Sequence, residues 1–299
     1  MPTEIQTSQS SNRISLLAPA KVNLFLHITG QRDDGFHELE SLFVRTDFGD
    51  QVTVEDAEII SLKIIGPFSA ALGGSLNETN LVVKAANCLL KHHGKTAGAK
   101  ITLEKNLPVA SGLGGGSADA AATLLALVAL WHVRISNDAL LSMALKLGSD
   151  VPACLENHPQ WVRGIGELCQ TVKLGYDAVI LLVNPCVHVS TPEVFKAYSI
   201  ATKPFSPMVV EKGNILSSIE ALESLSRNDL YEAALSLSPV IKEVIDILCD
   251  LPNQQMVRMS GSGATCFAIF NSLLEAEKAS KLLTIQKPKW WVASCKVMR

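Results

Sequence analysis

The hydrophobic and polar positions of the first half of the chain predict a mixture of strands and helices. Alternating or β-branched segments predict strands over residues 14–28 (as one or two strands), 38–46, 51–55, 59–65 and 100–104. Apolar residues at helical spacing predict helices over residues 80–93, 118–133 and 136–147. Residues 66–74 and the glycine-rich residues 108–117 lie between these elements and are predicted to be loops.

The pattern restarts beyond Gly164. Strands are predicted over residues 178–184, 256–260, 265–270 and 290–297, and helices over 192–198, 215–225, 230–235, 240–249 and 274–283. This mixture of antiparallel-looking strands and helices indicates an α+β fold class. We place a boundary near residue 160, which gives domains over residues 13–160 and 161–299 after a disordered tail over residues 1–12.

Length and composition agree with two folded domains. The chain has 299 residues, about twice the ~150 residues of a typical domain. Hydrophobic residues make up 47 % and charged residues 18 %, which is enough apolar material for a substantial core. The formal net charge is −3 and no dense run of Lys and Arg is present, so the composition argues against a nucleic-acid partner.

The cysteines and the apolar segments indicate a soluble, cytoplasmic protein. The seven cysteines are odd in number and form no Cys-x-x-Cys pair, which favours reduced thiols over a disulfide framework or a zinc site. The longest apolar stretch, residues 120–131, is too short to span a bilayer. Residues 1–12 lack the basic and apolar regions of a signal peptide. We therefore expect no membrane partner.

The strongest chemical signal is the segment Pro-Val-Ala-Ser-Gly-Leu-Gly-Gly-Gly-Ser-Ala at residues 108–118. It holds four glycines within five residues and leads directly into a predicted helix. Glycine permits positive φ angles and close approach of the backbone to a ligand. The free N–H groups and the dipole at a helix start favour an anion. The segment is therefore suited to binding phosphate groups, and a flexible structural turn is the weaker interpretation.

Several phosphate-binding classes can be compared with this segment. No Gly-Lys-Ser/Thr follows it, so it is not a Walker A loop, and no HRD or DFG motif indicates a protein kinase. Residues 112–117 nearly match a dinucleotide-binding fingerprint, which needs an acidic residue about 20 positions later. The nearest candidate, Asp138, lies in a Ser-Asn-Asp sequence typical of a helix cap. A dinucleotide-binding oxidoreductase therefore stays open as the alternative.

Two further motifs narrow the choice. The sequence Ala-Pro-Ala-Lys-Val-Asn-Leu at residues 18–24 places Lys21 and Asn23 in an apolar strand, where their polar groups need partners. The sequence Arg-Met-Ser-Gly-Ser-Gly-Ala at residues 258–264 is a second glycine turn between strands. In this order, the three motifs resemble the GHMP small-molecule kinase superfamily. Further similar segments lie at residues 28–37, 147–152, 164–167 and 190–195, and the resemblance covers nearly the whole chain from Leu17 onward.

The resemblance implies a fold and a reaction. It implies two α+β domains, with ATP and substrate meeting in the cleft between them. It also implies ATP-dependent phosphorylation of the 2-hydroxyl of 4-diphosphocytidyl-2-C-methyl-D-erythritol, a step of the non-mevalonate route to isoprenoid precursors. Mg²⁺ is expected with ATP, but no compact carboxylate cluster indicates its ligands. Related kinases acting on mevalonate, homoserine or galactose are the alternatives within this class.

The resemblance also implies roles for individual residues. Lys21 and Asp150 match the catalytic pair. Asn23, Phe36, His37, Thr191 and Phe195 match the substrate-binding residues. The ATP-binding segment consists of Pro108, Val109, Ala110, Ser111, Gly112, Leu113, Gly114, Gly115, Gly116, Ser117 and Ala118.

Structural interpretations stand beside several of these roles. From spacing alone, Asp150 would be an acid at a helix end that bonds to nearby backbone. Asn23 could be a structural amide, Thr191 could cap the helix that follows it, and either phenylalanine alone would usually belong to a core. Phe36 also departs from the superfamily pattern, since a tyrosine usually precedes the histidine; the ring is kept and the hydroxyl is lost.

Overall fold

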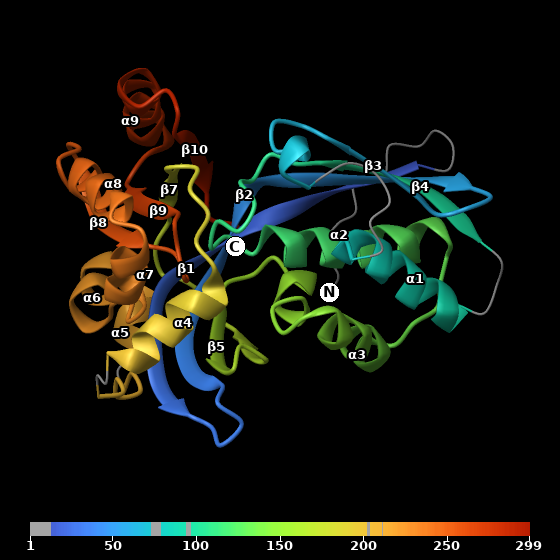
Figure 1. Ribbon diagram of the computed structural model, residues 1–299, viewed down its shortest axis with the longest axis horizontal. Coiled ribbons are helices and arrows are strands. Elements are labelled where there is room, and N and C mark those ends of the chain that lie inside the picture. The colour runs from blue at the N-terminus through green and yellow to red at the C-terminus, as the bar shows by residue number, and fades with distance from the viewer. Residues whose placement is uncertain (1–12, 73–78, 94–96, 202–203, 211) are drawn as a thin grey trace. The chain divides into compact units, whose positions relative to one another are not determined.

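The computed structural model describes residues 13–72, 79–93, 97–201, 204–210 and 212–299. The chain forms two compact units, each made of separate stretches of sequence (Figure 1). Unit 1 comprises the residues up to Ala20, Gly49–Val109 and Gly114–Asn157. Unit 2 comprises Lys21–Phe48, Ala110–Leu113 and His158–Arg299. Two long strands, β1 (Arg13–Gln31) and β2 (His37–Ala57), contribute residues to both units.

Unit 1 contains a twisted sheet in the order β3-β4-β2, with β1 paired to β2. β4 (Gly98–Glu104) pairs antiparallel with β2, from Gln51 opposite Glu104 to Ala57 opposite Gly98. β3 (Ser61–Ile65) pairs parallel with β4. The helical elements of unit 1 are η1 (Ser69–Leu72), α1 (Leu81–His93), α2 (Gly115–Leu130), α3 (Asn137–Leu147) and η2 (Pro152–Leu155).

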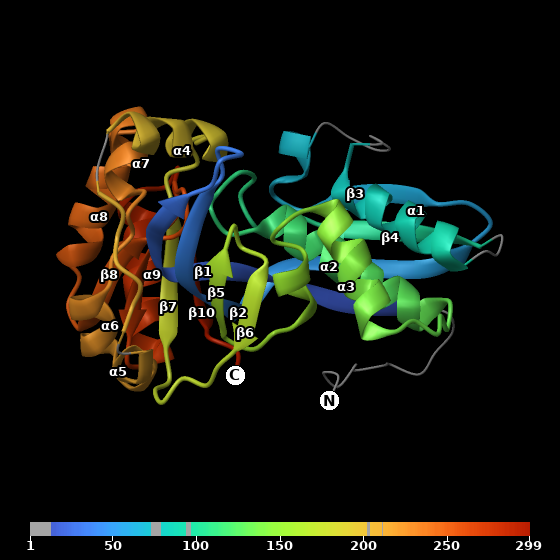
Figure 2. The same cartoon turned by 90° about the horizontal axis from the view of Figure 1, so that it is seen from below.

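The helices α1, α2 and α3 pack against one another on one face of this sheet, as two perpendicular views show (Figures 1 and 2). The core between helices and sheet is aliphatic and includes Val54, Ile101, Leu103, Leu124 and Leu127, all with at most 1 % of their surface exposed. Many alanines on α1 and α2 lie in the same cluster. Their small side chains let the two helices approach the sheet and each other closely.

Unit 2 contains two groups of strands. Leu39–Phe43 of β2 pairs antiparallel with β5 (Gln160–Gly164), which pairs antiparallel with β6 (Leu168–Thr171). A second, wholly antiparallel sheet has the order β10-β7-β9-β8. Its strands are β7 (Val179–Asn184), β8 (Gln254–Met259), β9 (Cys266–Phe270) and β10 (Trp291–Lys296).

The helices of unit 2 cover the four-stranded sheet. α8 (Val240–Cys249) packs on β8 and β9, and α9 (Leu273–Gln286) packs on β7 and β10 (Figure 1). The other helices are α4 (Thr191–Ile200), α5 (Lys212–Ser217), α6 (Ile219–Leu225) and α7 (Tyr231–Leu237). The hydrophobic cluster of this unit combines residues from the sheet, α4, α7, α8 and α9 with Leu26 and Ile28 of β1.

The structure confirms the α+β fold class and most of the predicted elements. Several predicted bounds differ from those observed, and three differences matter for the argument. The strands predicted over 38–46 and 51–55 are one continuous strand, β2. The helix predicted over 215–225 is interrupted at Ser218, whose side chain caps α6 by accepting a hydrogen bond from the Ala221 N–H at 3.2 Å. α2 begins at Gly115, three residues before its predicted start, because Gly114 takes a left-handed conformation (φ 64°) that serves as the N-cap.

Some elements were not predicted, and some predictions fall on residues that the structure does not describe. β5 and β6 were not predicted. The predicted loop over residues 66–74 contains η1, and its last two residues are not described. The tail predicted over residues 1–12 also lies outside the described residues. The domain boundary near residue 160 stays a prediction.

Gly49 allows β2 to approach the backbone of its neighbour β1 closely. A Cβ atom built on Gly49 would lie 2.1 Å from the carbonyl oxygen of Ala18 and 2.8 Å from the Cα of Pro19. No side chain fits at these distances, since the obstructing atoms belong to backbone. Glycine at this position therefore permits the close contact between the two long strands.

We predict that Gly49→Ala lowers the free energy of unfolding by about 1–3 kcal/mol, because the added methyl group overpacks a rigid backbone contact. The matched control is Gly213→Ala in α5, where an added Cβ meets nothing within 4 Å. That variant should gain about 0.5–1 kcal/mol from helix propensity. Urea unfolding followed by circular dichroism measures both, and equal stability of the two variants would refute the argument.

Candidate active site

The middle of the glycine-rich segment is held by backbone hydrogen bonds within unit 2. The Lys21 N–H on β1 donates to the Leu113 carbonyl oxygen at 2.8 Å. The Thr265 N–H donates to the Ser111 carbonyl oxygen at 3.2 Å, and the Ser260 hydroxyl donates to the Gly112 carbonyl oxygen at 3.1 Å. Residues 111–113 are therefore fixed between the Lys-containing strand and the second glycine turn. Three motifs that are far apart in the sequence meet here.

Gly112 makes this meeting possible. Its φ angle is 77°, which side chains rarely tolerate. A Cβ atom at this position would lie 2.5 Å from the Ser260 carbonyl oxygen and 2.8 Å from the Gly263 carbonyl oxygen. Gly261 and Gly263 of the facing turn also have positive φ angles, of 55° and 83°. Backbone therefore packs directly on backbone between the two glycine motifs.

Lys21 and Asn23 are both buried on β1 in unit 2. The Lys21 ammonium nitrogen lies 4.2 Å from the centroid of the Phe43 ring. The Asn23 N–H donates to the Ser260 hydroxyl at 3.1 Å, and its side-chain amide donates to the Ser41 hydroxyl at 2.9 Å. The Asn23 Oδ1 atom is buried and accepts no hydrogen bond from the described residues. Asn23 thus has a structural role through its nitrogen atoms and an open acceptor at its oxygen.

Thr191 lies at the first position of α4 and faces the second glycine turn. Its hydroxyl is 2.7 Å from the Ser262 hydroxyl. The N-cap of α4 is Ser190, so the interpretation of Thr191 as the helix cap was wrong. Thr191 is instead joined to the same turn that contacts Asn23 and Gly112.

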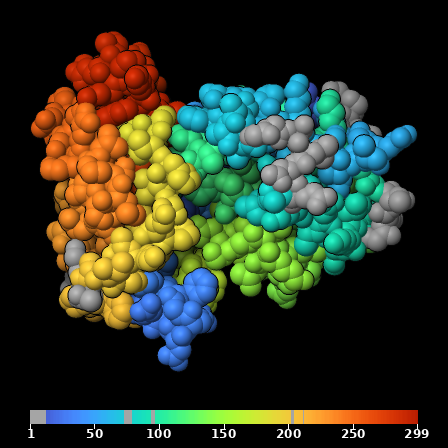
Figure 3. Space-filling view, viewed as in Figure 1, coloured from blue at the N-terminus to red at the C-terminus, as the bar shows by residue number. Residues whose placement is uncertain are grey.

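His37 is part of a cluster of rings formed by the start of β2 and one face of α4. Its ring centroid lies 5.4 Å from that of Phe195 and 5.7 Å from that of Tyr198. Its Nε2 atom is 3.0 Å from the Ser199 hydroxyl. Burial lowers the pKa of His37 below 6.5, which favours a neutral ring near pH 7. The β1–β2 hairpin and α4 form neighbouring parts of one surface (Figure 3).

Phe36 stands apart from this ring cluster. Its side chain is 60 % exposed, and its N–H donates to the Asp34 carboxylate at 3.2 Å within the hairpin turn. The structure therefore brings His37 together with Phe195 but leaves the Phe36 ring on the surface. Tyr198 was not predicted, although its position three residues after Phe195 on a helix gives a usable signal.

Asp150 belongs to unit 1 and lies between α3 and η2. α3 ends at Leu147 with Gly148 as its C-cap, and the Val151 N–H donates to the Gly148 carbonyl oxygen at 3.2 Å, which forms a tight turn around Asp150. The side chain of Asp150 is half-buried. Its partner in the predicted catalytic pair, Lys21, belongs to unit 2.

The two flanks of the glycine-rich segment belong to unit 1. On the later flank, the first hydrogen bond of α2 runs from the Ala118 N–H to the Gly114 carbonyl oxygen. The N–H groups of Gly115, Gly116 and Ser117 precede this bond and are not part of the helical ladder, which suits them to an anion. A dinucleotide-binding unit would need a neighbouring parallel strand after α2. The chain continues into α3 instead, and the next strand, β5, pairs antiparallel with β2.

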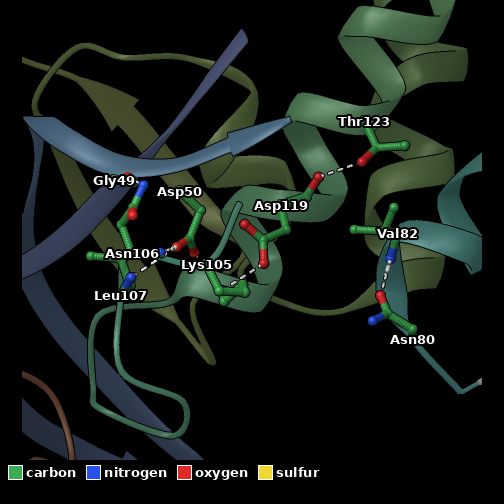
Figure 4. Close-up of polar contacts among 9 residues, drawn as sticks. All are labelled: Gly49, Asp50, Asn80, Val82, Lys105, Asn106, Leu107, Asp119 and Thr123. Atoms are coloured by element: carbon green, nitrogen blue, oxygen red, sulfur yellow. Dashed lines mark hydrogen bonds and ion pairs between the residues drawn. The ribbon is translucent and has the colours of Figure 1, made fainter. Parts of the chain in front are cut away.

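A cluster of three buried charged side chains lies beside these flanks, and we call it the buried charge cluster: Asp50, Lys105 and Asp119 (Figure 4). The Lys105 ammonium group donates to Asp50 Oδ2 and, at 2.8 Å, to Asp119 Oδ2. Asp50 Oδ1 accepts hydrogen bonds from the N–H groups of Asn106 at 2.6 Å and Leu107 at 2.8 Å. Asp119 Oδ1 is buried without a partner among the described residues.

The pKa values of Asp119 and Lys105 are both raised, for different reasons. Burial and the nearby Asp50 charge raise the pKa of Asp119 to about 8, against the opposing effect of Lys105. Burial alone would lower the pKa of Lys105, but the two carboxylates raise it. The sequence analysis did not identify this cluster. Its signals are a single acidic residue, Asp119, at the start of a strongly apolar helix and Lys105 three residues before Pro108.

Neither a protein-only metal site nor a membrane span is present in the described part of the chain. No group of three or more His, Cys, Asp and Glu side chains is arranged to hold a metal ion there. No described helix combines the length and the apolar character needed to cross a bilayer.

Comparison with known families matches two segments of the chain. The family described as "GHMP kinases N terminal domain" matches residues 80–158, and the family described as "GHMP kinases C terminal" matches residues 210–285. The first segment includes α2 and Asp150, and the second includes the glycine turn at Gly261 and Gly263.

Whole-chain relatives extend this similarity. The chain is 44 % identical over 282 residues to a 4-diphosphocytidyl-2-C-methyl-D-erythritol kinase of Cereibacter sphaeroides (strain KD131), covering 94 % of this chain and 98 % of the relative. It is 42 % identical over 287 residues to the enzyme of that name from Paramagnetospirillum magneticum, covering 95 % and 98 %. A crystal structure of a 4-(cytidine 5'-diphospho)-2C-methyl-D-erythritol kinase superposes with a TM-score of 0.81 at 33 % identity, covering 96 % of this chain and 100 % of that one.

The raised pKa of Asp119 predicts a pH dependence of stability. Between pH 3.8, the ordinary carboxyl value, and about 8, the native protein holds a proton on Asp119 that the unfolded chain has released. The free energy of unfolding should therefore fall as pH rises through this range, by at most ~1.4 kcal/mol per pH unit. Asp119→Asn cannot titrate, so its stability relative to wild type should increase with pH.

Urea unfolding at pH 5, 6, 7 and 8 measures this difference. The control is Asp138→Asn, which changes an exposed acid in the first turn of α3. Its pH profile should run parallel to that of wild type. A parallel profile for Asp119→Asn as well would show that Asp119 is already ionised in the native state at pH 5.

Proposed function

The chain belongs to the GHMP kinases, and from this premise we propose that it transfers the γ-phosphoryl group of ATP to the 2-hydroxyl of 4-diphosphocytidyl-2-C-methyl-D-erythritol. The observation that carries the proposal is the 44 % identity to an enzyme named for this acceptor, over 94 % of the chain. A place in non-mevalonate isoprenoid precursor synthesis and a cytoplasmic location follow as parts of the proposal.

ATP is proposed to bind at the segment from Pro108 to Ala118. Support comes from the N–H groups at the start of α2 and from the positive φ angle of Gly114, a residue without a side chain at the N-cap of that helix. ATP supplies the phosphoryl group, and Mg²⁺ is proposed to accompany it, because phosphoryl transfer needs neutralisation of the developing negative charge. No residue of this chain is assigned as a metal ligand.

The acceptor is proposed to contact Asn23, Phe36, His37, Thr191 and Phe195. The unpartnered Oδ1 atom of Asn23 is a hydrogen-bond acceptor suited to a polyol hydroxyl. The rings of His37 and Phe195 offer a flat surface on which a pyrimidine can stack. Discrimination between bases requires hydrogen bonds to the pyrimidine edge, which a neutral His37 can donate and accept.

Asp150 is proposed to accept the proton of the attacking hydroxyl, and Lys21 to neutralise charge on the transferring phosphoryl group. The burial of Lys21 supports its part, since a charge in a region of low dielectric acts more strongly than one in water. Asp150 lies in a tight turn that restricts its backbone, which suits a group that must be held in one place.

Release of ADP with a panel of acceptors tests the proposed function. We expect ADP release with 4-diphosphocytidyl-2-C-methyl-D-erythritol and none above background with mevalonate, homoserine or galactose. A preference for one of these three acceptors would assign the chain to a different branch of the same superfamily. Absence of ADP release with every acceptor would contradict the kinase activity itself.

Asp150→Asn should lower kcat by at least ~10²-fold, the usual scale for losing a general base. Binding of ATP and acceptor should persist, because asparagine has nearly the same shape. Steady-state kinetics together with calorimetric titration of both ligands measures the two effects. A folded Asp150→Asn protein with near-normal kcat would remove Asp150 from the proposed mechanism.

Phe195→Ala should raise the KM for the cytidylylated acceptor by about 5–150-fold, which corresponds to ~1–3 kcal/mol of lost stacking. Phe36→Ala should act in the same direction, and Phe36→Tyr should change little if the ring supplies most of the energy. KM for ATP should stay constant in all three. Phe205→Ala, which removes a ring that is 47 % exposed elsewhere in unit 2, is the control. A rise in KM for ATP alone would place these rings on the nucleotide side.

A further inference from the structure

The buried charge cluster joins the two flanks of the glycine-rich segment. Asp50 accepts from the N–H groups of Asn106 and Leu107, the two residues that precede Pro108. Asp119 lies on the first turns of α2, and Lys105 connects its carboxylate to that of Asp50 (Figure 4). The residues before the segment bind Asp50, and the helix after it carries Asp119. The Lys105 ammonium group contacts both carboxylates and so connects the two flanks.

The cluster also lies directly against the start of α2. A Cβ atom built on Gly115 would be 3.4 Å from both Asp50 Oδ2 and the Lys105 ammonium nitrogen. Gly115 has no side chain of its own beyond Cα, so the cluster lies next to the backbone of the first helical residue. A change in the charge of the cluster is felt at short range there, with little water between to screen it.

A purely structural role does not explain why this cluster is ionic. Replacing buried ion pairs with apolar residues of similar volume is often neutral or stabilising, so charge is not needed to hold these elements together. Two carboxylates also share one ammonium group, which leaves one negative charge in excess when both are ionised. The Oδ1 atom of Asp119, which has no hydrogen-bond partner in the described part of the chain, adds a further desolvation cost.

We propose that Asp50, Lys105 and Asp119 are positioning residues that hold the start of α2 for the phosphate groups of ATP and that their net charge sets the affinity for the nucleotide. This inference rests on the proposed function. The roles are indirect, since Lys105 acts by fixing the two flanks and by balancing the carboxylates beside them. A nucleotide phosphate is an anion, so an uncompensated negative charge beside its binding segment weakens binding.

The pKa of Asp119 supports the second part of this proposal. The charged groups that face Asp119 are Asp50, which lies on β2, and Lys105, the residue that follows β4. Below pH 8, a protonated Asp119 leaves the cluster neutral, with one carboxylate and one ammonium group. Above about pH 8, Asp119 ionises and the cluster carries one negative charge. Affinity for ATP should therefore fall as pH rises through this value.

Calorimetric titration of the full chain with ATP, at pH 7 and pH 9 and without acceptor, tests the proposal. Wild-type affinity should fall about three- to tenfold between the two pH values, as expected for one added charge at short range. Asp119→Asn cannot ionise, so it should lose most of this pH dependence. Lys105→Met should bind ATP at least ~10-fold more weakly at pH 7. Its KM for the acceptor, measured separately by steady-state kinetics, should change less than ~2-fold.

The control is Lys100→Met, which removes an exposed lysine on β4 that pairs with Glu55 at 3.2 Å. It should match wild type at both pH values. Unchanged ATP affinity in a folded Lys105→Met protein, or an Asp119→Asn protein with the full pH dependence, would overturn the proposal. If Lys105→Met fails to fold, the Asp119→Asn comparison decides. Wild-type protein that binds no ATP would contradict the proposed function as well, which separates the two failures.

Discussion

The close approach of backbone to backbone at Gly112 is the constraint on which the candidate site depends. The Ser260 and Gly263 carbonyl oxygens occupy the space that any side chain at residue 112 would need. Because that space is filled by backbone, the glycine-rich segment can accept hydrogen bonds from β1 and from the second glycine turn at the same time. Lys21 and Asn23 are thereby placed beside the turn within unit 2. A methyl group at this one position would separate all three motifs.

The same eleven-residue segment, residues 108–118, is held by two different kinds of interaction in the two units. In unit 2, its middle is fixed by neutral hydrogen bonds, each worth about 0.5–1.5 kcal/mol net. In unit 1, its flanks are fixed by charge-assisted bonds: the N–H groups of Asn106 and Leu107 donate to Asp50, and the Lys105 ammonium group joins Asp50 to Asp119. The neutral bonds fix the shape of the backbone, whereas the charged bonds also create an electrostatic potential. A segment that is to bind a polyanion depends on both.

A buried polar atom without a hydrogen-bond partner lowers the free energy of unfolding. Asn23 Oδ1 and Asp119 Oδ1 are both buried without partners among the described residues, and each carries a desolvation cost of about 1–3 kcal/mol or more. Asn23 lies on β1, the strand that also holds Lys21, and Asp119 lies on the first turns of α2. Polar atoms of this kind persist in a core when something other than stability requires them, which here is proposed to be ligand binding and charge balance.

The sequence by itself determined the fold class, most helices and strands, and the three motifs of the site, because these depend on local properties. Periodicity reports which face of an element is buried, and runs of glycine report where the backbone needs unusual φ angles. The sequence could not show that Gly112 packs on Ser260, that Phe36 is exposed while His37 packs on Phe195 and Tyr198, or that Asp50, Lys105 and Asp119 share one site. Those contacts join residues up to about 160 positions apart. Only the tertiary structure decides them, since no local pattern encodes which distant backbone or charge a side chain will meet.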